Sequence, residues 1–309
     1  MIKEKIMPTD SMNYHRPVLL KETIDGLNIK PHGVYIDATY GFGGHSKSIL
    51  DRLDYKGRLF AFDCDFDTSK HLIDHPSYVF VQSNFRYISN FMDSYNISQA
   101  DGILADFGVS SYQIDTPTRG FSYQRDGKLD MRMNQNQTLT AFEVINHYDT
   151  DALSKVFYQY GELIKARKIA EQIVISRSQN EINTTFDLKE ILSSLLGKGR
   201  ENKTLAKIFQ AIRIEVNQEL DAIKIFLKQC AKLLKPAGRL VCISYHSLED
   251  RLVKFFIQTG NFSNQPIKDF YGNVIKPLNK VGKLIRPSAE EINQNPRARS
   301  AKLRIAEKR

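Results

Sequence analysis

The stretch Gly33-Val-Tyr-Ile-Asp37, followed by Tyr40-Gly-Phe-Gly-Gly-His45, decides the fold. Its β-branched and aromatic run predicts a strand, and residues 46–53 have a helical pattern. The glycines between them allow a tight turn, where the backbone can approach a ligand and the next helix points its N-terminus at it. The stretch therefore predicts a strand, a glycine turn and a helix.

The alternation of strand and helix continues along the chain. Further strands are predicted at 58–63, 78–82 and 102–106, separated by stretches long enough for helices. Apolar residues between 217 and 234 then fall on one helical face, before the turn Lys235-Pro-Ala-Gly238 and a strand at 239–244. This spacing predicts a parallel α/β sheet.

About 110 residues separate Asp106 from Asn217, far more than a normal crossover between parallel strands needs. They have mainly helical patterns and predict an inserted helical domain. We place a core at 1–113 and 211–309 and the insertion at 114–210. The predicted inserted helices are 138–148, 151–160, 164–178, 186–196 and 203–216.

Charge and composition restrict the classes of function. The first sixteen residues have no apolar core, and no apolar run approaches the ~20 residues that a bilayer needs, so we expect a cytoplasmic protein. The three cysteines lack metal-ligand spacing and are interpreted as buried thiols. Residues 277–309 hold nine Lys/Arg and three Glu, two thirds of the net charge of +9. Such a cluster suits a phosphate backbone, although a solvated surface would look similar.

Two aspartates end predicted strands at the edge where open α/β sheets bind ligands. Asp63 stands 22 residues after Gly41, where a carboxylate can accept the ribose hydroxyls of an adenosine-containing ligand. Asp106 ends the fourth strand, and its alternative role is to cap a helix. A dinucleotide fingerprint would need glycine or alanine where Ser46 stands, so a nicotinamide site is disfavoured.

The segment Ser244-Tyr-His-Ser-Leu-Glu-Asp-Arg251 follows another strand and opens a helix. A capping box from Ser247 to Asp250 explains part of it without function. Tyr245 and His246 remain, at an edge where they could stack on a base or hydrogen-bond it. We expect no metal site, because only His71 and His75 approach ligand spacing and they lie in a polar stretch.

Several motifs in order make the chain resemble the bacterial 16S rRNA (cytosine-N4)-methyltransferase H family over nearly its whole length. They are His15-Arg-Pro-Val-Leu-Leu20, Asp37-Ala-Thr-Tyr-Gly-Phe-Gly-Gly-His-Ser46, Asp106-Phe-Gly-Val-Ser-Ser111, Arg119-Gly-Phe-Ser122, Leu129-Asp-Met-Arg-Met133, Phe209-Gln-Ala-Ile-Arg-Ile214, Ser244 to Arg251, and Asn295-Pro-Arg-Ala-Arg-Ser300.

The resemblance implies a Rossmann-like methyltransferase core with an inserted mainly helical domain, S-adenosylmethionine as the methyl donor, and the N4 of a cytidine in the decoding region of 16S rRNA as the acceptor. It implies binding to the small ribosomal subunit, with no membrane, and it is compatible with a homodimer. Carried over by position, the cofactor contacts are Gly43, Gly44, His45, Asp63, Phe85, Asp106 and Gln113.

Roles in chemistry and in RNA binding follow as hypotheses. Asp106 or a neighbouring carbonyl would accept a hydrogen bond from N4, which must shed a proton, while Tyr245 and His246 hold a base splayed out of its stack. Cations of the C-terminal segment would bind phosphates: Arg297, Arg299, Lys302 and Arg304.

The sequence departs from the family's pattern in the insertion. Gly161-Glu-Leu-Ile164 stands for Gly-Glu-Glu-Arg, and Asn202-Lys-Thr-Leu205 for His-Pro-Ala-Thr, so the details of RNA docking are in doubt. Two other functions stay open: a methyltransferase on another nucleic-acid base, and a ribosome-assembly factor with a vestigial cofactor pocket. The intact Gly41, Gly43, Gly44, Asp63 and Asp106 argue against the second.

Overall fold

A computed structural model describes residues 17–197 and 199–309, so His15 and Arg16 of the first motif lie outside the described residues. Its centre is a seven-stranded sheet with the order β3-β2-β1-β4-β5-β7-β6. The first five strands are parallel to one another, and β7 runs antiparallel to both β5 and β6. The strands are β1 (Val34–Asp37), β2 (Arg58–Asp63), β3 (Tyr78–Gln82), β4 (Ala100–Asp106), β5 (Leu234–Ser244), β6 (Leu278–Ile285) and β7 (Lys302–Lys308).

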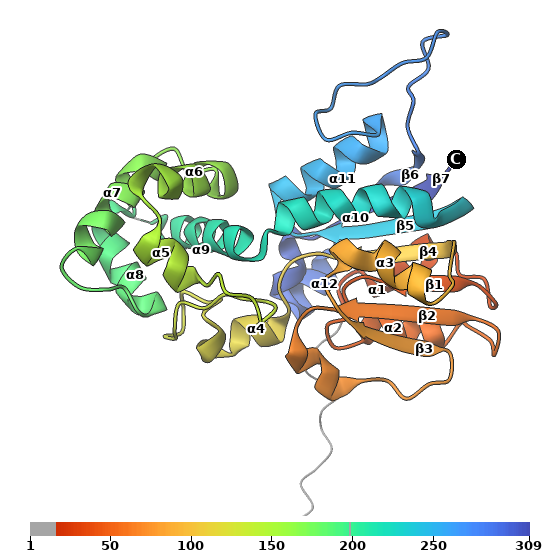
Figure 1. Cartoon of the computed structure of the whole chain (residues 1–309), viewed down its shortest axis with the longest axis horizontal. Coiled ribbons are helices and arrows are strands. Elements are labelled where there is room, and N and C mark those ends of the chain that lie inside the picture. Colours follow the sequence, from red (N-terminus) through yellow and green to blue (C-terminus); the bar gives the residue numbers. More distant parts are fainter. Residues whose placement is uncertain (1–16, 198) are drawn as a thin grey trace, which may run out of the picture.

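Helices cover both faces of this sheet (Figure 1). One face packs its apolar side chains against α3 (Ile88–Ser94), α10 (Glu219–Leu233) and α11 (Ser247–Thr259). The other packs against α1 (Leu20–Leu27) and α2 (Gly44–Leu50). This doubly wound arrangement confirms the predicted Rossmann-like α/β core. Two short helices complete it, α4 (Ser111–Asp115) and α12 (Ala289–Gln294).

The long segment between β4 and α10 is helical, and its helices lie to one side of the sheet in Figure 1. They share a separate apolar cluster that extends from Phe121 to Val216. We call the helices α5 to α9 the inserted helices. The predicted boundary at residue 210 falls inside the last of them. The inserted helices are α5 (Ala141–His147), α6 (Thr150–Gly161), α7 (Ala166–Arg177), α8 (Thr185–Leu192) and α9 (Glu201–Asn217).

The basic C-terminal segment 277–309, in which no strand was predicted, contains β6 and β7. Residues 302–308 form β7 in the middle of the antiparallel half of the sheet, because Leu303 and Ala306 are buried between charged neighbours. The predicted turn at 235–238 lies within β5, with Ala237 at φ +60°. Cys230 and Cys242 are buried and Cys64 is half-buried. Among the described residues, no helix is both long and apolar enough to cross a membrane.

Candidate active site

A cavity of about 350 Å³ opens at the carboxyl edge of the parallel strands. Its volume is within the range of small-molecule sites, and α/β sheets bind ligands at this edge. Side chains from strand ends, α4, α9 and α10 meet there. The polar groups on its wall include Thr39, His45, Asp63, Ser83, Asn84, Asp106, Ser110, Ser111, Gln113, Arg213, Asn217, Glu219, Tyr245, Glu249, Asn295 and Arg297.

The glycine turn after β1 forms one side of this cavity. Gly41 and Gly43 have φ of +57° and +75°, a region that strains residues with a side chain. A Cβ on Gly44 would lie 2.2 Å from Pro17 Cγ, so only glycine lets the N-terminus of α2 approach that segment. Gly44 and His45 line the cavity, as predicted for cofactor contacts, whereas Gly43 shapes the turn behind the wall.

Asp37 and Ser46 support the turn from below. The Ser46 hydroxyl donates to Asp37 Oδ2 at 2.7 Å, and the Thr39 amide donates to Oδ1 at 3.1 Å. Burial raises the pKa of Asp37 to about 6 against these hydrogen bonds. The serine that excluded a dinucleotide fingerprint is thus the partner of a buried carboxyl group.

Asp63 occupies the end of β2 beside the turn, as predicted. Its carboxylate accepts from the Gly41 amide at 2.8 Å and from the Asp65 amide at 2.9 Å. Burial raises its pKa to about 7, while the two amide hydrogen bonds oppose the shift. Each oxygen accepts one amide and keeps a lone pair, so the group can still accept hydroxyls from a ligand.

Phe85 and Gln113, assigned by resemblance, both lie on the cavity wall. The Phe85 ring packs edge-to-face on Phe226 and itself presents an apolar surface to the cavity. Gln113 is buried, with its amide used on both sides: its oxygen accepts from the Ser110 amide at 3.0 Å and its nitrogen donates to Asp65 at 2.7 Å. Gln113 therefore positions α4 as well as lining the site.

Asp106 lines the cavity from the end of β4. Its Oδ1 is buried without a hydrogen-bond partner. Burial raises the pKa of Asp106 to about 8, the Tyr245 hydroxyl that donates to the carboxyl group lowers it, and Asp37 and Glu249 raise it again. A buried acid with a raised pKa and a free oxygen is a candidate proton acceptor.

Tyr245 and His246 lie side by side in sequence but have different positions. Tyr245 lines the cavity, and its pKa is raised by burial and by Asp106. His246 instead caps α11: it shares a capping box with Glu249, whose Oε2 accepts from the Tyr245 amide at 2.7 Å and the His246 amide at 3.2 Å. The predicted capping box from Ser247 to Asp250 was therefore wrong by one residue, and His246 is not among the cavity-lining residues.

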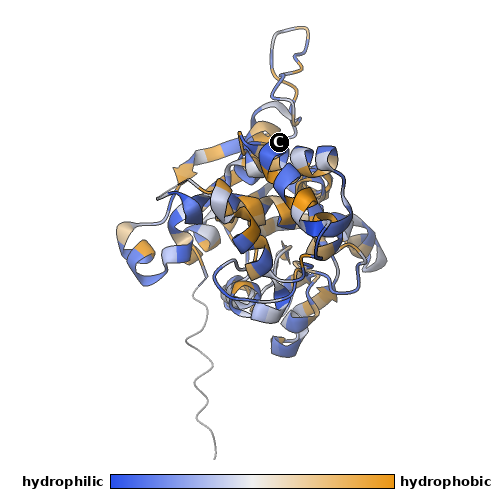
Figure 2. Ribbon diagram, turned by 90° about the vertical axis from the view of Figure 1, so that its left-hand side faces the viewer, coloured by the Kyte–Doolittle hydropathy of each residue, from blue (hydrophilic) through white to orange (hydrophobic). Residues whose placement is uncertain are grey.

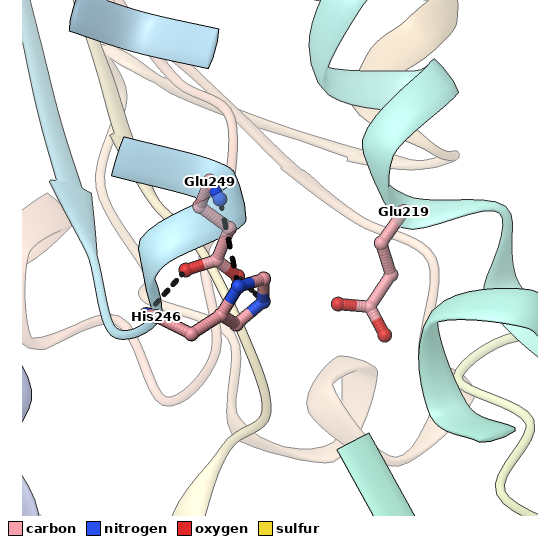
Figure 3. Close-up of side chains that lie close together, drawn as sticks. All are labelled: Glu219, His246 and Glu249. Atoms are coloured by element: carbon pink, nitrogen blue, oxygen red, sulfur yellow. Dashed lines mark hydrogen bonds and ion pairs between the residues drawn. The ribbon is translucent and has the colours of Figure 1, made fainter. Parts of the chain in front are cut away.

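Glu249 is fully buried and the sequence reasoning missed it. Glu249, His246 and Glu219 of α10 each have a nitrogen or oxygen atom that could bind a metal, and these atoms lie within 4.8 Å of one another. In Figure 3 the Glu219 carboxylate faces the His246 imidazole. The Arg213 guanidinium, however, donates two hydrogen bonds to the Glu219 carboxylate, at 2.8 and 2.9 Å, and lies 4.0 Å from Glu249. We interpret the cluster as an ion-pair network. Burial alone would raise the pKa of Glu249, but His246 and Arg213 hold it below its usual value.

A second network that sequence spacing did not reveal joins the core to the start of the insertion. The Arg119 guanidinium is buried and pairs with Asp65 and Asp67, both at 2.8 Å. It also donates to the carbonyls of Arg132 and Met133. The only signal was the Arg-Gly-Phe-Ser motif, which named Arg119 without its partners.

The four predicted RNA-binding cations differ in how free they are. Lys302 and Arg304 both pair with Asp250, at 3.2 and 2.7 Å, and so bind β7 to α11. Arg297 lines the cavity and pairs with Asp115 at 2.7 Å, with 44% of its side chain exposed. Arg299 is exposed.

These groups fit a ligand that contains an adenosine. A carboxylate stands at the end of β2 for ribose hydroxyls, an aromatic ring lies on the wall nearby, and backbone turns approach closely on glycines. On the other side, Asp106 and Tyr245 offer an acceptor and a hydroxyl to a second reactant. The cavity is therefore suited to a transfer between two bound molecules.

Comparison with known proteins agrees with this geometry. A family model described as the MraW methylase family matches residues 12–309. The ribosomal RNA small subunit methyltransferase H of Christiangramia forsetii is 54% identical over 297 residues, which cover 96% of this chain and 98% of that protein. The proteins of the same name from Flavobacterium johnsoniae and Phocaeicola vulgatus are 53% and 52% identical, over 97% and 96% of this chain and 99% and 98% of theirs. The resemblance drawn from the motifs is confirmed, and the chain belongs to the MraW methylase family.

Proposed function

We propose that the chain transfers a methyl group from S-adenosylmethionine to the exocyclic N4 of a cytidine in the decoding region of 16S rRNA, within the small ribosomal subunit. Family membership and the names of the relatives support a ribosomal RNA methyltransferase. The observation that carries the finer assignment is Asp106: its Oδ1 is buried without a hydrogen-bond partner, while the Tyr245 hydroxyl donates to the same carboxyl group.

S-adenosylmethionine, when bound, supplies an electrophilic methyl group on a sulfonium. We assign the adenosine of this ligand to Asp63 and Phe85. We assign the part of the ligand that contacts the protein backbone to the glycine turn. Residues Gly44 and His45 line that part of the cavity, and Gln113 holds α4 against it.

The lone pair of a cytosine N4 is delocalised into the ring, so the amine must be held in line and must lose a proton. In the proposed step the N4–methyl bond forms as the methyl–sulfur bond breaks, and one N4 proton passes to Asp106 Oδ1. Tyr245 donates to the same carboxyl group and fixes its orientation. A positively charged group bound in the cavity, such as the sulfonium, would favour the charged form of Asp106, and the charged form can accept that proton.

The cytosine base must leave its stack in the RNA to reach Asp106 in the cavity. His246 acts indirectly, because its contact with Glu249 fixes the backbone that carries Tyr245. We narrow the proposed phosphate contacts to Arg299 and Arg297. The pair of Arg297 with Asp115 is exposed, at 44% and 42%, whereas Lys302 and Arg304 pair with the more buried Asp250.

The test is a methylation assay on whole small subunits. The protein is incubated with labelled S-adenosylmethionine and subunits from a strain without this activity, with already modified subunits as the matched control, and the RNA nucleosides are identified by mass spectrometry. N4-methylcytidine at a single site of the unmodified subunits is expected. Label in another nucleoside would favour a different base, and subunit binding with no label would favour an assembly factor.

A further inference from the structure

A hairpin projects from the core between α11 and β6 (Figures 1 and 2). Residues 267–275 pair across it: the Ile275 amide donates to the Ile267 carbonyl at 2.8 Å, and the Asp269 amide to the Asn273 carbonyl at 2.9 Å. The hairpin's polar, glycine-containing sequence is typical of a loop. The tip is ordered by its own hydrogen bonds.

Asp269 is used entirely within this tip. Its carboxylate accepts from the amides of Tyr271 and Asn273, both at 2.9 Å, and from the Asn273 side chain at 3.2 Å. Gly272 follows with φ +85°, which closes the turn. The acid thus serves the turn, and these contacts hold the two aromatic residues at the outer end.

Phe270 and Tyr271 are 97% and 85% exposed. Their rings meet at 87° with centroids 5.6 Å apart, so each leaves a face open to solvent. Two such side chains at one tip are costly to leave in water and are typical of a contact surface. Neither belongs to the cavity wall.

The hairpin and the strand after it are also basic. Lys268, Lys276, Lys280 and Lys283 all lie between 268 and 283, against Asp269 alone. None of the ion pairs among the described residues involves these lysines, in contrast to Lys302 and Arg304, which Asp250 neutralises. The positive charge that is available to a partner therefore lies here more than on β7.

We propose that the hairpin 267–275 is a second RNA-binding element, which stacks Phe270 and Tyr271 on unpaired bases of the ribosomal RNA while Lys268 and the lysines that follow the hairpin contact phosphates. Aromatic side chains beside free cations are how proteins bind unpaired RNA. A membrane wedge would need an apolar tip, whereas this one carries Asp269, Gly272 and Asn273. The inference rests on the proposed RNA substrate.

The experiment compares three full-length proteins: wild type, Phe270→Ser/Tyr271→Ser, and the control Tyr55→Ser, which removes an equally exposed ring elsewhere on the core. For each, the Kd for unmodified small subunits is measured by filter binding, alongside turnover at saturating subunits. Sedimentation with phosphatidylglycerol and phosphatidylethanolamine vesicles and the oligomeric state are measured in parallel. Thermal unfolding checks that all three are folded.

The double variant is expected to raise the Kd for subunits at least about thirtyfold, the effect of losing two stacked bases, with turnover at saturation unchanged. Tyr55→Ser should bind as wild type does. If the double variant binds subunits like wild type while wild type methylates them, the hairpin's role is overturned and the proposed function stands. If the double variant loses only vesicle binding, or only self-association, the proposed role of the hairpin is also overturned. If the wild type neither binds nor methylates subunits, both proposals are rejected.

Discussion

The carboxyl edge of the core sheet and the interior of the inserted helices bury different kinds of side chain. At the edge, Asp37, Asp63, Asp106 and Glu249 lie within one small region, three of them with pKa values raised by burial. The cluster inside the inserted helices is apolar, from Phe121 to Val216. Buried acids cost stability and are retained where chemistry needs them. The comparison supports our proposal that the reaction takes place on the core, and we propose that the inserted helices hold the substrate.

The largest expected effect comes from Asp106→Asn, which keeps the shape of the side chain but cannot accept a proton. Turnover should fall by about 10²–10⁴, the usual contribution of a general base. The matched control is Asp101→Asn, near the other end of the same strand, where the carboxylate pairs with Lys235 at 2.6 Å. Methylation assays and calorimetric binding of S-adenosylhomocysteine separate chemistry from cofactor affinity. Near-normal turnover of Asp106→Asn would remove its assigned role.

Phe157→Ala tests whether the inserted helices can be damaged without the core. Phe157 is fully buried in their apolar cluster, so its truncation should cost about 3–5 kcal/mol of unfolding free energy. Tyr158→Ala, at the exposed neighbour, should change it by less than about 0.5 kcal/mol. Subunit binding is expected to weaken while S-adenosylhomocysteine still binds. Loss of cofactor binding in parallel would mean that the two regions are one cooperative unit.

The acids of the edge predict how stability depends on pH. A carboxyl group whose pKa is raised from near 4 to about 8 binds its proton more tightly when folded, so its contribution is complete below pH 4 and is lost as pH rises toward 8. The unfolding free energy should therefore fall between pH 5 and 8, by at most about 1.4 kcal/mol per pH unit for each group. Urea titrations should show a shallower fall for Asp106→Asn. An identical slope would contradict the raised pKa.

The smallest effect is expected at the contact between the two regions. Glu162, at the end of α6, accepts from Ser247 at 2.9 Å and pairs with Arg251 at 3.0 Å on α11. Because the pair is partly exposed, Glu162→Ala should cost up to about 1 kcal/mol, seen as a rise of up to about fivefold in KM for subunits with kcat unchanged. Glu171→Ala, which breaks an exposed pair inside the inserted helices, is the control. If Glu162→Ala has the same KM for subunits as wild type, the contact does not position the inserted helices for substrate binding.

Local sequence patterns predicted the parallel half of the sheet well. β2 and β3 begin and end where their apolar runs do, and Asp63 and Asp106 stand at the cavity because strand ends converge there. No strand was predicted at β7, because Lys-Leu-Arg-Ile-Ala-Glu-Lys308 belongs to the basic segment whose charge was interpreted as a phosphate-binding cluster or a solvated surface. Its charged side chains are paired only after folding brings Asp250 beside them.

The candidate site was predicted only in part, for the same reason. Residues that belong to a local motif were found, including Gly44 and Tyr245. The Glu249, Arg213 and Glu219 network depends on α9, α10 and α11 meeting in space, which no spacing along the chain records. The hairpin tip at Phe270 was hidden in a polar, glycine-containing segment that is typical of a loop.

The most direct test of the central claim is a crystal structure of the chain with S-adenosylhomocysteine and a cytidine-containing oligonucleotide. The account predicts the adenosine ribose on Asp63 and the cytosine N4 within hydrogen-bonding distance of Asp106, beside Tyr245. A cytosine whose amine lies away from Asp106, or an adenosine bound elsewhere than Asp63, would contradict it.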